Sequence, residues 1–231
     1  MKFAFDPGAV PSLPINGSNE RFPVHRIYCV GRNYADHARE MGGNPEREPP
    51  FFFSKPADAI VESGGEVPYP PRTEDLHHEI ELVVAIGREV KNIPLEDAAA
   101  YIFGYAIGTD LTRRDLQSKS RDAGRPWDTA KGFDHSAPIT AIHRIEETGI
   151  IERGEIWLTV NLEKRQTSNL DQMIWSVPEI IAELSQLYTL KPGDLIFTGT
   201  PSGVGPLIEG DEVEGGVELL GILRFKIADD D

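Results

Sequence analysis

The sequence predicts a strand-rich α+β domain. Short apolar runs bounded by turn residues outnumber the segments with helical periodicity, and strands and helices do not alternate regularly along the chain. The 231 residues, 39% of them hydrophobic, are enough for one large domain with a sizeable core. A doubly wound parallel sheet is disfavoured, because it requires regular alternation of strands and helices.

The first 23 residues differ from the rest of the chain. They contain four prolines and little hydrophobic periodicity, so we expect residues 1–23 to form an arm or a small strand-bearing appendage. The main domain is then expected to comprise residues 24–231.

Seven segments have the pattern of strands, because they are short, apolar and bounded by turn residues. They are residues 26–30, 51–55, 79–86, 102–108, 155–163, 194–199 and 217–227.

Fewer segments are expected to be helical. The best candidate is 177–187, where Ser176 and Glu179 have the spacing of a capping box and isoleucines and leucines form one apolar face. Three further helices are expected at 34–41, between Asn33 and Gly42, at 94–100, and at 111–119 after Asp110.

Composition excludes several classes of function. The formal net charge of −15 makes nucleic acid and anionic membranes poor partners, because both bind to basic surfaces. The single cysteine, Cys29, excludes a disulfide framework and multi-cysteine metal sites. No apolar run approaches the ~20 residues of a membrane helix, and prolines interrupt the start where a signal peptide would be apolar. We therefore expect a soluble, cytoplasmic protein.

Familiar catalytic signatures are absent from the sequence. It contains neither a G-x-x-x-x-G-K-[ST] phosphate loop nor a G-x-S-x-G nucleophile elbow, and Cys29 lies within a predicted apolar strand. Covalent hydrolases of the common types are therefore disfavoured.

Three carboxylates form the clearest candidate site. Glu79 and Glu81 are two residues apart in an otherwise apolar strand, so both project from one face. Asp110 follows another apolar strand and is either the N-cap of the next helix or a third ligand. Such oxygen ligands suit Mg²⁺, Mn²⁺ or Ca²⁺. The alternative is an edge strand with two solvated glutamates.

Two other patterns suit catalysis at such a site. His37 and Glu40 are three residues apart in the predicted 34–41 helix, so the carboxylate can orient the imidazole as a base for water. Lys55 and Lys131 lie in apolar surroundings suited to binding an anion. Each pattern also has an ordinary interpretation: a surface His–Glu pair, and lysines whose ammonium groups extend to water.

The chain resembles the fumarylacetoacetate hydrolase family, specifically its small acylpyruvases. The matching motifs occur in order from about residue 24 to the C-terminus. They are VGRNYADH (30–37), FSKP (53–56), HHEIEL (77–82), GTD (108–110), RDLQ (114–117), KGFD (131–134), GD (193–194) and TGTPSGVG (198–205). The resemblance implies a mixed β-sandwich roll that forms a homodimer. One peripheral departure is Asn161-Leu162, where members often have Asn-Gly.

The resemblance also implies a role for each matched position. Glu79, Glu81 and Asp110 would bind Mg²⁺ or Mn²⁺, with Ca²⁺ also compatible. His37 and Glu40 would form a base dyad on a lid, and Lys131 would lie beside the metal. The expected substrate contacts are Arg32, Lys55, Arg114, Gln117 and Thr200.

The implied reaction is metal-dependent hydrolysis of the C–C bond of an acylpyruvate, a small anionic 2-oxo acid, with pyruvate leaving as its enolate. Residues 26–55 most resemble fumarylpyruvate hydrolases, which form fumarate and pyruvate. An oxaloacetate decarboxylase, or a 2-oxo acid isomerase or hydratase, would use the same metal site. The alternative outside catalysis is a metal-stabilised interaction module, in which His37, Glu40 and Lys131 would have no role in ligand binding.

Overall fold

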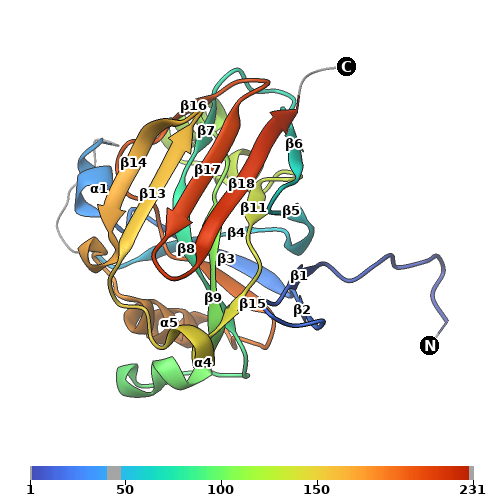
Figure 1. Cartoon of the computed structure of the whole chain (residues 1–231), viewed down its shortest axis with the longest axis vertical. Helices are drawn as coiled ribbons and strands as arrows, with labels where there is room; N and C mark the ends of the chain where they lie inside the picture. Colours follow the sequence, from blue (N-terminus) through green and yellow to red (C-terminus); the bar gives the residue numbers. More distant parts are fainter. Residues whose placement is uncertain (1, 41–47, 229–231) are drawn as a thin grey trace.

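The structure is a computed structural model that describes residues 2–40 and 48–228. Its two main sheets pack face to face, with the β13–β14 and β17–β18 hairpins in front of the larger sheet in Figure 1. The larger sheet has the order β4 (Phe51–Lys55), β3 (Arg26–Gly31), β15 (Asp194–Phe197), β8 (Ile80–Ile86), β9 (Ile102–Thr109), β11 (Ala137–Ile139) and β5 (Ile60–Glu62), and β12 (His143–Arg144) also pairs with β9. The strand-rich roll predicted from the sequence is confirmed.

The second sheet and two small ones complete the β structure of these residues. The second sheet has the order β14 (Glu163–Asn169), β13 (Glu155–Val160), β17 (Glu212–Val217), β18 (Gly221–Ala228) and β6 (Glu66–Pro68). The small sheets are β10 (Thr112–Arg113), β7 (Leu76–His78) and β16 (Gly205–Leu207), and the pair β1 (Ser12–Pro14) and β2 (Arg21–Pro23).

Strand β8 lies in the middle of the larger sheet, paired with β15 on one side and β9 on the other. All seven of its residues are buried. Its even-numbered side chains, such as Leu82 and Val84, join the core between the two main sheets, and Val83 and Ala85 join a second core on the opposite face. An edge strand with solvated glutamates, the alternative for Glu79 and Glu81, is therefore wrong.

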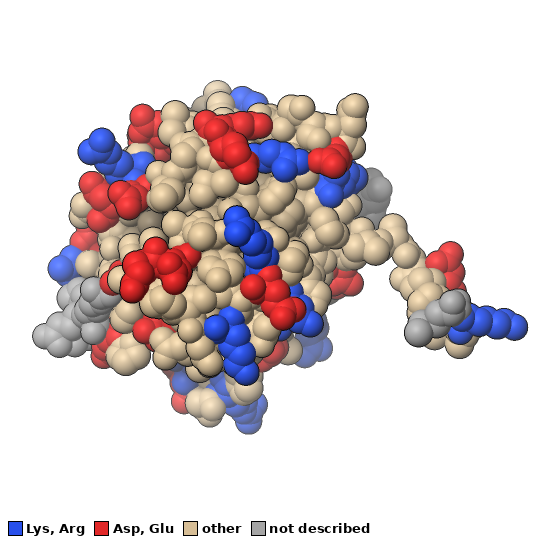
Figure 2. Space-filling model, turned by 90° about the horizontal axis from the view of Figure 1, so that it is seen from below, with Lys and Arg blue, Asp and Glu red and all other residues tan. Residues whose placement is uncertain are grey.

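The N-terminal segment has two parts. Residues 2–10 are exposed and stand clear of the body in Figures 1 and 2. The β1–β2 hairpin that follows buries Leu13 and Phe22 in the second core. The expected domain boundary at residue 23 stays a prediction.

The helices cover the ends of the sheets. They are α1 (Ala35–Glu40), α2 (Arg114–Asp122), α3 (Asp128–Lys131), α4 (Ile145–Thr148) and α5 (Val177–Leu187), with 3₁₀ helices η1 (Ala57–Ala59), η2 (Leu95–Tyr101) and η3 (Leu170–Gln172). Helix α5 has the predicted bounds, and the backbone N–H of Ser176 donates to the Glu179 carboxylate at 2.9 Å. Among the helices in the described part of the chain, none is both long and apolar enough to cross a membrane.

The other helix predictions need correction. The segment predicted as a helix at 94–100 forms η2, and the helix expected from 111 begins only at Arg114, so Asp110 is not its N-cap. The side chain of Asn33 does not cap α1, because its amide bonds the backbone of Trp175 and Thr198 instead. Gly42, the expected end of that helix, lies outside the described residues.

Two predicted strands proved too long because each contains a turn. The segment 217–227 includes the turn between β17 and β18, where Leu219 adopts φ +74°. The segment 155–163 includes the Asn161-Leu162 turn, and the polar, largely exposed edge strand β14 that follows was not predicted. An apolar run hides a turn when a bulky residue occupies the left-handed region, because sequence patterns assign that region to glycine or asparagine.

The Asn161-Leu162 turn gives a test of this interpretation. Both residues have positive φ, 51° and 66°, as in a type I′ hairpin turn, and Leu162 is 86% exposed. Leu162→Gly should raise the free energy of unfolding by about 1 kcal/mol, because glycine adopts this conformation without steric cost. Urea titration would measure the change. Leu162→Ala is the control, because it removes the exposed side chain and keeps the strain; a gain as large as glycine's would contradict the argument.

Candidate active site

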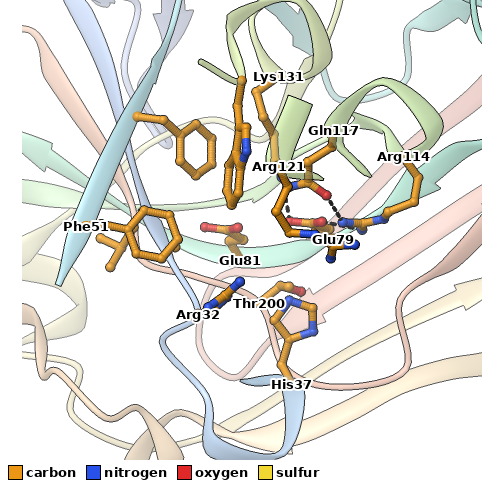
Figure 3. A pocket seen from close by; sticks show the side chains of 14 residues that line it. Arg32, His37, Phe51, Glu79, Glu81, Arg114, Gln117, Arg121, Lys131 and Thr200 are labelled. Carbon is orange, nitrogen blue, oxygen red and sulfur yellow. Dashed lines mark hydrogen bonds and ion pairs between the residues drawn. The ribbon is translucent and has the colours of Figure 1, made fainter. Parts of the chain in front are cut away.

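A pocket at one end of the larger sheet collects side chains from six parts of the chain (Figure 3). The β3–α1 connection supplies Arg32, helix α1 supplies His37, and β4 supplies two phenylalanines. The remaining lining comes from the β7–β8 segment, the α2–α3 region and the loop after β15. These groups are Glu79, Glu81, Arg114, Gln117, Arg121, Trp127, Lys131 and Thr200.

The register of β8 and β9 brings the three predicted carboxylates together. The chain leaves β7 and enters β8 at Glu79, and Ile80 pairs with Thr109. Asp110 therefore follows directly opposite Glu79, and its N–H donates to the Glu79 carbonyl at 2.8 Å. One oxygen from each of Glu79, Glu81 and Asp110 lies within 4.8 Å of the others, and all three side chains are buried. Antiparallel pairing thus joins groups some 30 residues apart in sequence.

Buried cations neutralise two of these carboxylates. The ammonium of Lys131 lies 2.9 Å from Glu79 Oε2 and 2.7 Å from Asp110 Oδ2, and that of Lys55 lies 2.8 Å from Asp110 Oδ1. Arg114 Nη2 lies 2.5 Å from Glu79 Oε1. Neither lysine extends to water, because burying these carboxylates unpaired would be costly.

The third carboxylate is in a different electrostatic environment. Burial raises the pKa of Glu81 well above its usual value, and the negative charges of Asp110 and Glu79 raise it further. Burial also raises the pKa of Glu79, but Lys131 and Arg114 outweigh it and hold that pKa well below its usual value. Burial lowers the pKa of Lys131, whereas Asp110 and Glu79 raise it more. Negative charge is therefore least compensated at Glu81.

This donor set fits a divalent cation. Carboxylate oxygens are the ligands that Mg²⁺, Mn²⁺ and Ca²⁺ prefer, and oxygens around one ion lie about 3–5 Å apart. A cation here would also relieve the repulsion that raises the pKa of Glu81. The Gly199 N–H donates to Glu81 Oε2 at 2.6 Å, which holds this carboxylate in place at the pocket.

His37 and Glu40 form a contact within α1, as the sequence spacing predicts. His37 Nδ1 lies 3.1 Å from Glu40 Oε2, and the Gly203 N–H donates to both oxygens of Glu40 at 3.1 and 3.2 Å. A carboxylate can only accept here, so Nδ1 carries the proton and Nε2 keeps its lone pair. His37 is only 6% exposed and lines the pocket, whereas Glu40 is exposed, so the imidazole of this pair is not a solvated surface group.

The predicted substrate contacts divide into two groups. Arg32, Arg114, Gln117 and Thr200 line the pocket. Lys55 does not: its ammonium lies behind Asp110, where it also donates to the carbonyls of Leu111 and Lys131. Lys55 therefore pairs with Asp110 and does not face the pocket, where a contact with a ligand was expected.

Besides Val30 and Gly31 of β3, the sequence analysis did not assign four pocket residues to the site. Phe51, Phe53 and Trp127 form an aromatic wall, with the Phe51 and Trp127 rings 5.5 Å apart. Arg121 approaches from the end of α2. The helical spacing could have indicated Arg121, because it follows Gln117 by four residues and so lies on the same face. The aromatic residues have no comparable signal, since buried and pocket-lining phenylalanines look alike in a sequence.

The chain belongs to the fumarylacetoacetate hydrolase family, because the model of the fumarylacetoacetate (FAA) hydrolase C-terminal domain matches residues 26–228. The family resemblance inferred from the ordered motifs is therefore confirmed. The prediction of a metal-dependent C–C hydrolase is confirmed at the level of the family.

The chain is similar to three proteins whose names state an activity. The crystal structure of fumarylpyruvate hydrolase from Pseudomonas aeruginosa in complex with Mn²⁺ and pyruvate has a TM-score of 0.97 and 51% identity, covering 99% of this chain and 100% of that one. A fumarylpyruvate hydrolase from a Ralstonia species is 48% identical over 74% of this chain and 88% of its own. The human mitochondrial oxaloacetate tautomerase FAHD1 is 43% identical over 87% of this chain and 90% of its own.

The opposite pKa shifts of Glu79 and Glu81 predict opposite effects on stability when each residue is replaced by glutamine. A raised pKa means that the folded, metal-free protein loses stability as pH rises through the folded-state pKa of Glu81, so Glu81→Gln should leave its stability at pH 8 unchanged or higher. A lowered pKa means that ionised Glu79 contributes stability above pH ~4, so Glu79→Gln should cost roughly 3 kcal/mol. Denaturant titration without metal measures both.

The same two variants test metal binding. Mn²⁺ should raise the melting temperature of the parent protein, because an ion that binds only the folded state stabilises it. Glu81→Gln should lose most of this rise although its fold is intact. An undiminished rise would remove Glu81 from the metal site, and a loss of stability equal to that of Glu79→Gln would contradict the charge assignment.

Proposed function

We propose that this protein is a divalent-metal-dependent hydrolase that cleaves the C–C bond of acylpyruvates, with fumarylpyruvate as its best substrate. The observation that carries the proposal is that Glu79 and Glu81, two members of a buried carboxylate triad, line one pocket together with an imidazole oriented by Glu40. The Mn²⁺ and pyruvate in the similar Pseudomonas aeruginosa enzyme support both the metal and the pyruvyl half of the substrate.

Glu79, Glu81 and Asp110 would hold the cation. When bound, it supplies a Lewis acid that polarises the keto and carboxylate oxygens of a 2-oxo acid. Mg²⁺ and Mn²⁺ both suit these ligands, and Mn²⁺ has the support of the relative. The three carboxylates thus provide the docking point for the pyruvyl end.

His37 is the group placed to activate water. Its Nδ1 proton is engaged by Glu40, so Nε2 accepts a proton from a water molecule that attacks the distal carbonyl of the substrate. Glu40 stabilises the imidazolium that forms. The C–C bond then breaks, and its electron pair leaves with pyruvate as the enolate.

Donors that line the pocket stabilise the developing negative charge. The Lys131 ammonium, the Gln117 amide and the Thr200 hydroxyl line the region beside the triad. A protein nucleophile is not required, because water attacks directly. Cys29 does not serve as one: it is fully buried, and burial raises the pKa of its thiol well above the usual value.

Charge in the outer part of the pocket supports a substrate with two carboxylates. Arg114 and Lys131 are engaged by Glu79, whereas the guanidinium groups of Arg32 and Arg121 have no ion pair with a pocket carboxylate among the described residues. Arg32 lies over the Phe51 ring, and Arg121 Nε lies 3.2 Å from Oδ1 of the exposed Asp122. Fumarylpyruvate has a distal carboxylate that suits these two guanidinium groups. Acetylpyruvate has none.

Oxaloacetate tautomerisation is the second candidate, because the 43% identical human relative is named for it. Oxaloacetate also has two carboxylates and a 2-oxo acid end. Decarboxylation of oxaloacetate would use the same groups, without a water molecule. An interaction module with no catalysis is disfavoured, because His37 and Lys131 line the same pocket as Glu79 and Glu81. Homodimer formation and a cytoplasmic location stay predictions.

The proposal predicts a definite order of substrates. Purified protein with Mn²⁺ or Mg²⁺ should release pyruvate fastest from fumarylpyruvate, more slowly from acetylpyruvate, and not after EDTA treatment. Coupled pyruvate assays measure the first two, and the enol–keto absorbance change of oxaloacetate measures tautomerisation. Activity on oxaloacetate alone would support the second candidate and contradict hydrolysis.

A variant of the base separates these reactions further. His37→Gln should reduce hydrolysis of fumarylpyruvate by roughly 100-fold or more, because the amide cannot accept the proton from water. It should retain the rise in melting temperature on adding Mn²⁺, since His37 is not a ligand. Unchanged hydrolysis in this variant would place the base elsewhere.

Arg121 provides a test of substrate choice. Arg121→Gln should lower kcat/KM for fumarylpyruvate about tenfold, because one charge-assisted contact to the distal carboxylate is lost. Its kcat/KM for acetylpyruvate should change little. Arg125→Gln makes the same charge change at an exposed position outside the pocket lining and serves as the control. Equal losses on both substrates would contradict a second carboxylate subsite.

A further inference from the structure

Gln166 is a buried amide behind the pocket. It lies on β14, an edge strand whose preceding residues are exposed, yet it is itself 0% exposed. Its side chain makes four hydrogen bonds. Oε1 lies 2.9 Å from His78 Nδ1 and 3.1 Å from the Ile80 N–H, and Nε2 donates to Thr200 Oγ1 and to the Pro201 carbonyl, each at 2.8 Å. All the bonding capacity of this amide is used for groups around the triad and the glycine-rich loop.

Two backbone groups fix the orientation of the amide. The Ile80 N–H can only donate, so it faces the amide oxygen, and the Pro201 carbonyl can only accept, so it faces the amide nitrogen. If the amide were flipped, its nitrogen would face the Ile80 N–H donor and its oxygen would face the Pro201 carbonyl, and neither pair could form a hydrogen bond in this buried region. His78 must then donate through Nδ1, because the amide oxygen has no proton to give.

The orientation of Gln166 determines what Thr200 offers to the pocket. Thr200 Oγ1 accepts the Nε2–H proton, so its own hydroxyl proton is directed to another acceptor. Thr200 lines the pocket, and no acceptor for this proton is found among residues 2–40 and 48–228.

We propose that Gln166 is a positioning residue that fixes the Thr200 hydroxyl as a hydrogen-bond donor to a carboxylate oxygen of the ligand. This inference rests on the proposed function, because it takes the ligand to be a 2-oxo acid. Gln166 does not touch the ligand and acts through Thr200.

A hydrogen bond also determines which group of Gln117 faces the ligand. Arg114 Nη1 donates to Gln117 Oε1 at 2.5 Å, so the Gln117 oxygen is occupied and its amide nitrogen is the group left for a ligand. The Lys131 ammonium adds positive charge beside them, while its three N–H groups are directed at Glu79, Asp110 and Thr112. This part of the pocket therefore presents donors to the ligand, which favours a carboxylate over an amide or an alcohol.

Substitutions of Gln166 should change ligand affinity in a defined order. In Gln166→Glu, the carboxylate can accept the Thr200 hydroxyl proton and withdraw it from the pocket. In Gln166→Met, the hydroxyl is no longer held and can still rotate toward a ligand. We expect pyruvate and oxalate to bind the Mn²⁺-loaded Glu variant roughly tenfold more weakly than the parent, with a smaller loss for Met. Isothermal titration calorimetry measures both.

A double-mutant cycle with Thr200 separates positioning from structural damage. Thr200→Val should weaken pyruvate and oxalate binding by the same roughly tenfold factor, and Thr200→Ser, which restores the hydroxyl, should recover most of it. In the Thr200→Val background, exchanging Gln166 for Met should have little further effect on affinity. Melting temperatures of all variants identify any loss of fold.

Two results would overturn the proposal. One is a loss of affinity on Gln166→Met that is equally large with Thr200 and with Val at position 200, because Gln166 would then act by another route. The other is a Thr200→Val variant that binds pyruvate as tightly as the parent. Neither result depends on the acyl group, so a failure of the fumarylpyruvate assignment alone would appear as normal pyruvate binding without fumarylpyruvate turnover.

Discussion

The burial of three carboxylates at the centre of the protein is the constraint on which the rest of the structure depends. Glu79, Glu81 and Asp110 are at most 5% exposed, and ionised groups in such surroundings require nearby positive charge. Lys131 and Lys55 supply it, from α3 and β4, elements far from the triad in sequence. Because these cations must lie beside the triad, the α2–α3 region and the paired strands β3 and β4 are held at the end of the central strands.

The negative charges of the three carboxylates are compensated to different extents. Cations pair with Glu79 and Asp110, whereas no ion pair is made by Glu81 among the described residues, so the negative charge of Glu81 is the least stabilised of the three until a cation binds. Beside it, the Thr200 hydroxyl and the Gln117 amide nitrogen are donors, and Gln166 and Arg114 set their orientation. The pocket thus suits a cation and an anionic ligand bound together.

The sequence predicted more of the residues in the site than of the contacts between them. Period-two spacing identified Glu79 and Glu81, and helical spacing identified His37 and Glu40, because both patterns are local. The role of Asp110 stayed open until β8–β9 register placed it opposite Glu79, and Lys55 lies behind the triad because of sheet pairing between β3 and β4. Gln166 gave no signal at all, since a single amide in a polar edge strand looks like surface. The turn at Leu219 was missed because two of its residues, Leu219 and Leu220, are apolar.

The Glu40 carboxylate has two partners, and this sharing links the imidazole of helix α1 to the glycine-rich loop. It binds His37 within α1 and the N–H of Gly203 in the loop that carries Thr200. The loop is held on its other side by β14, where a Cβ on Gly203 would lie 2.2 Å from the Arg165 carbonyl. Helix α1 therefore cannot move away without breaking its hold on the loop. Loss of the Glu40 carboxylate would therefore free the imidazole of His37 and the loop that carries Thr200 together.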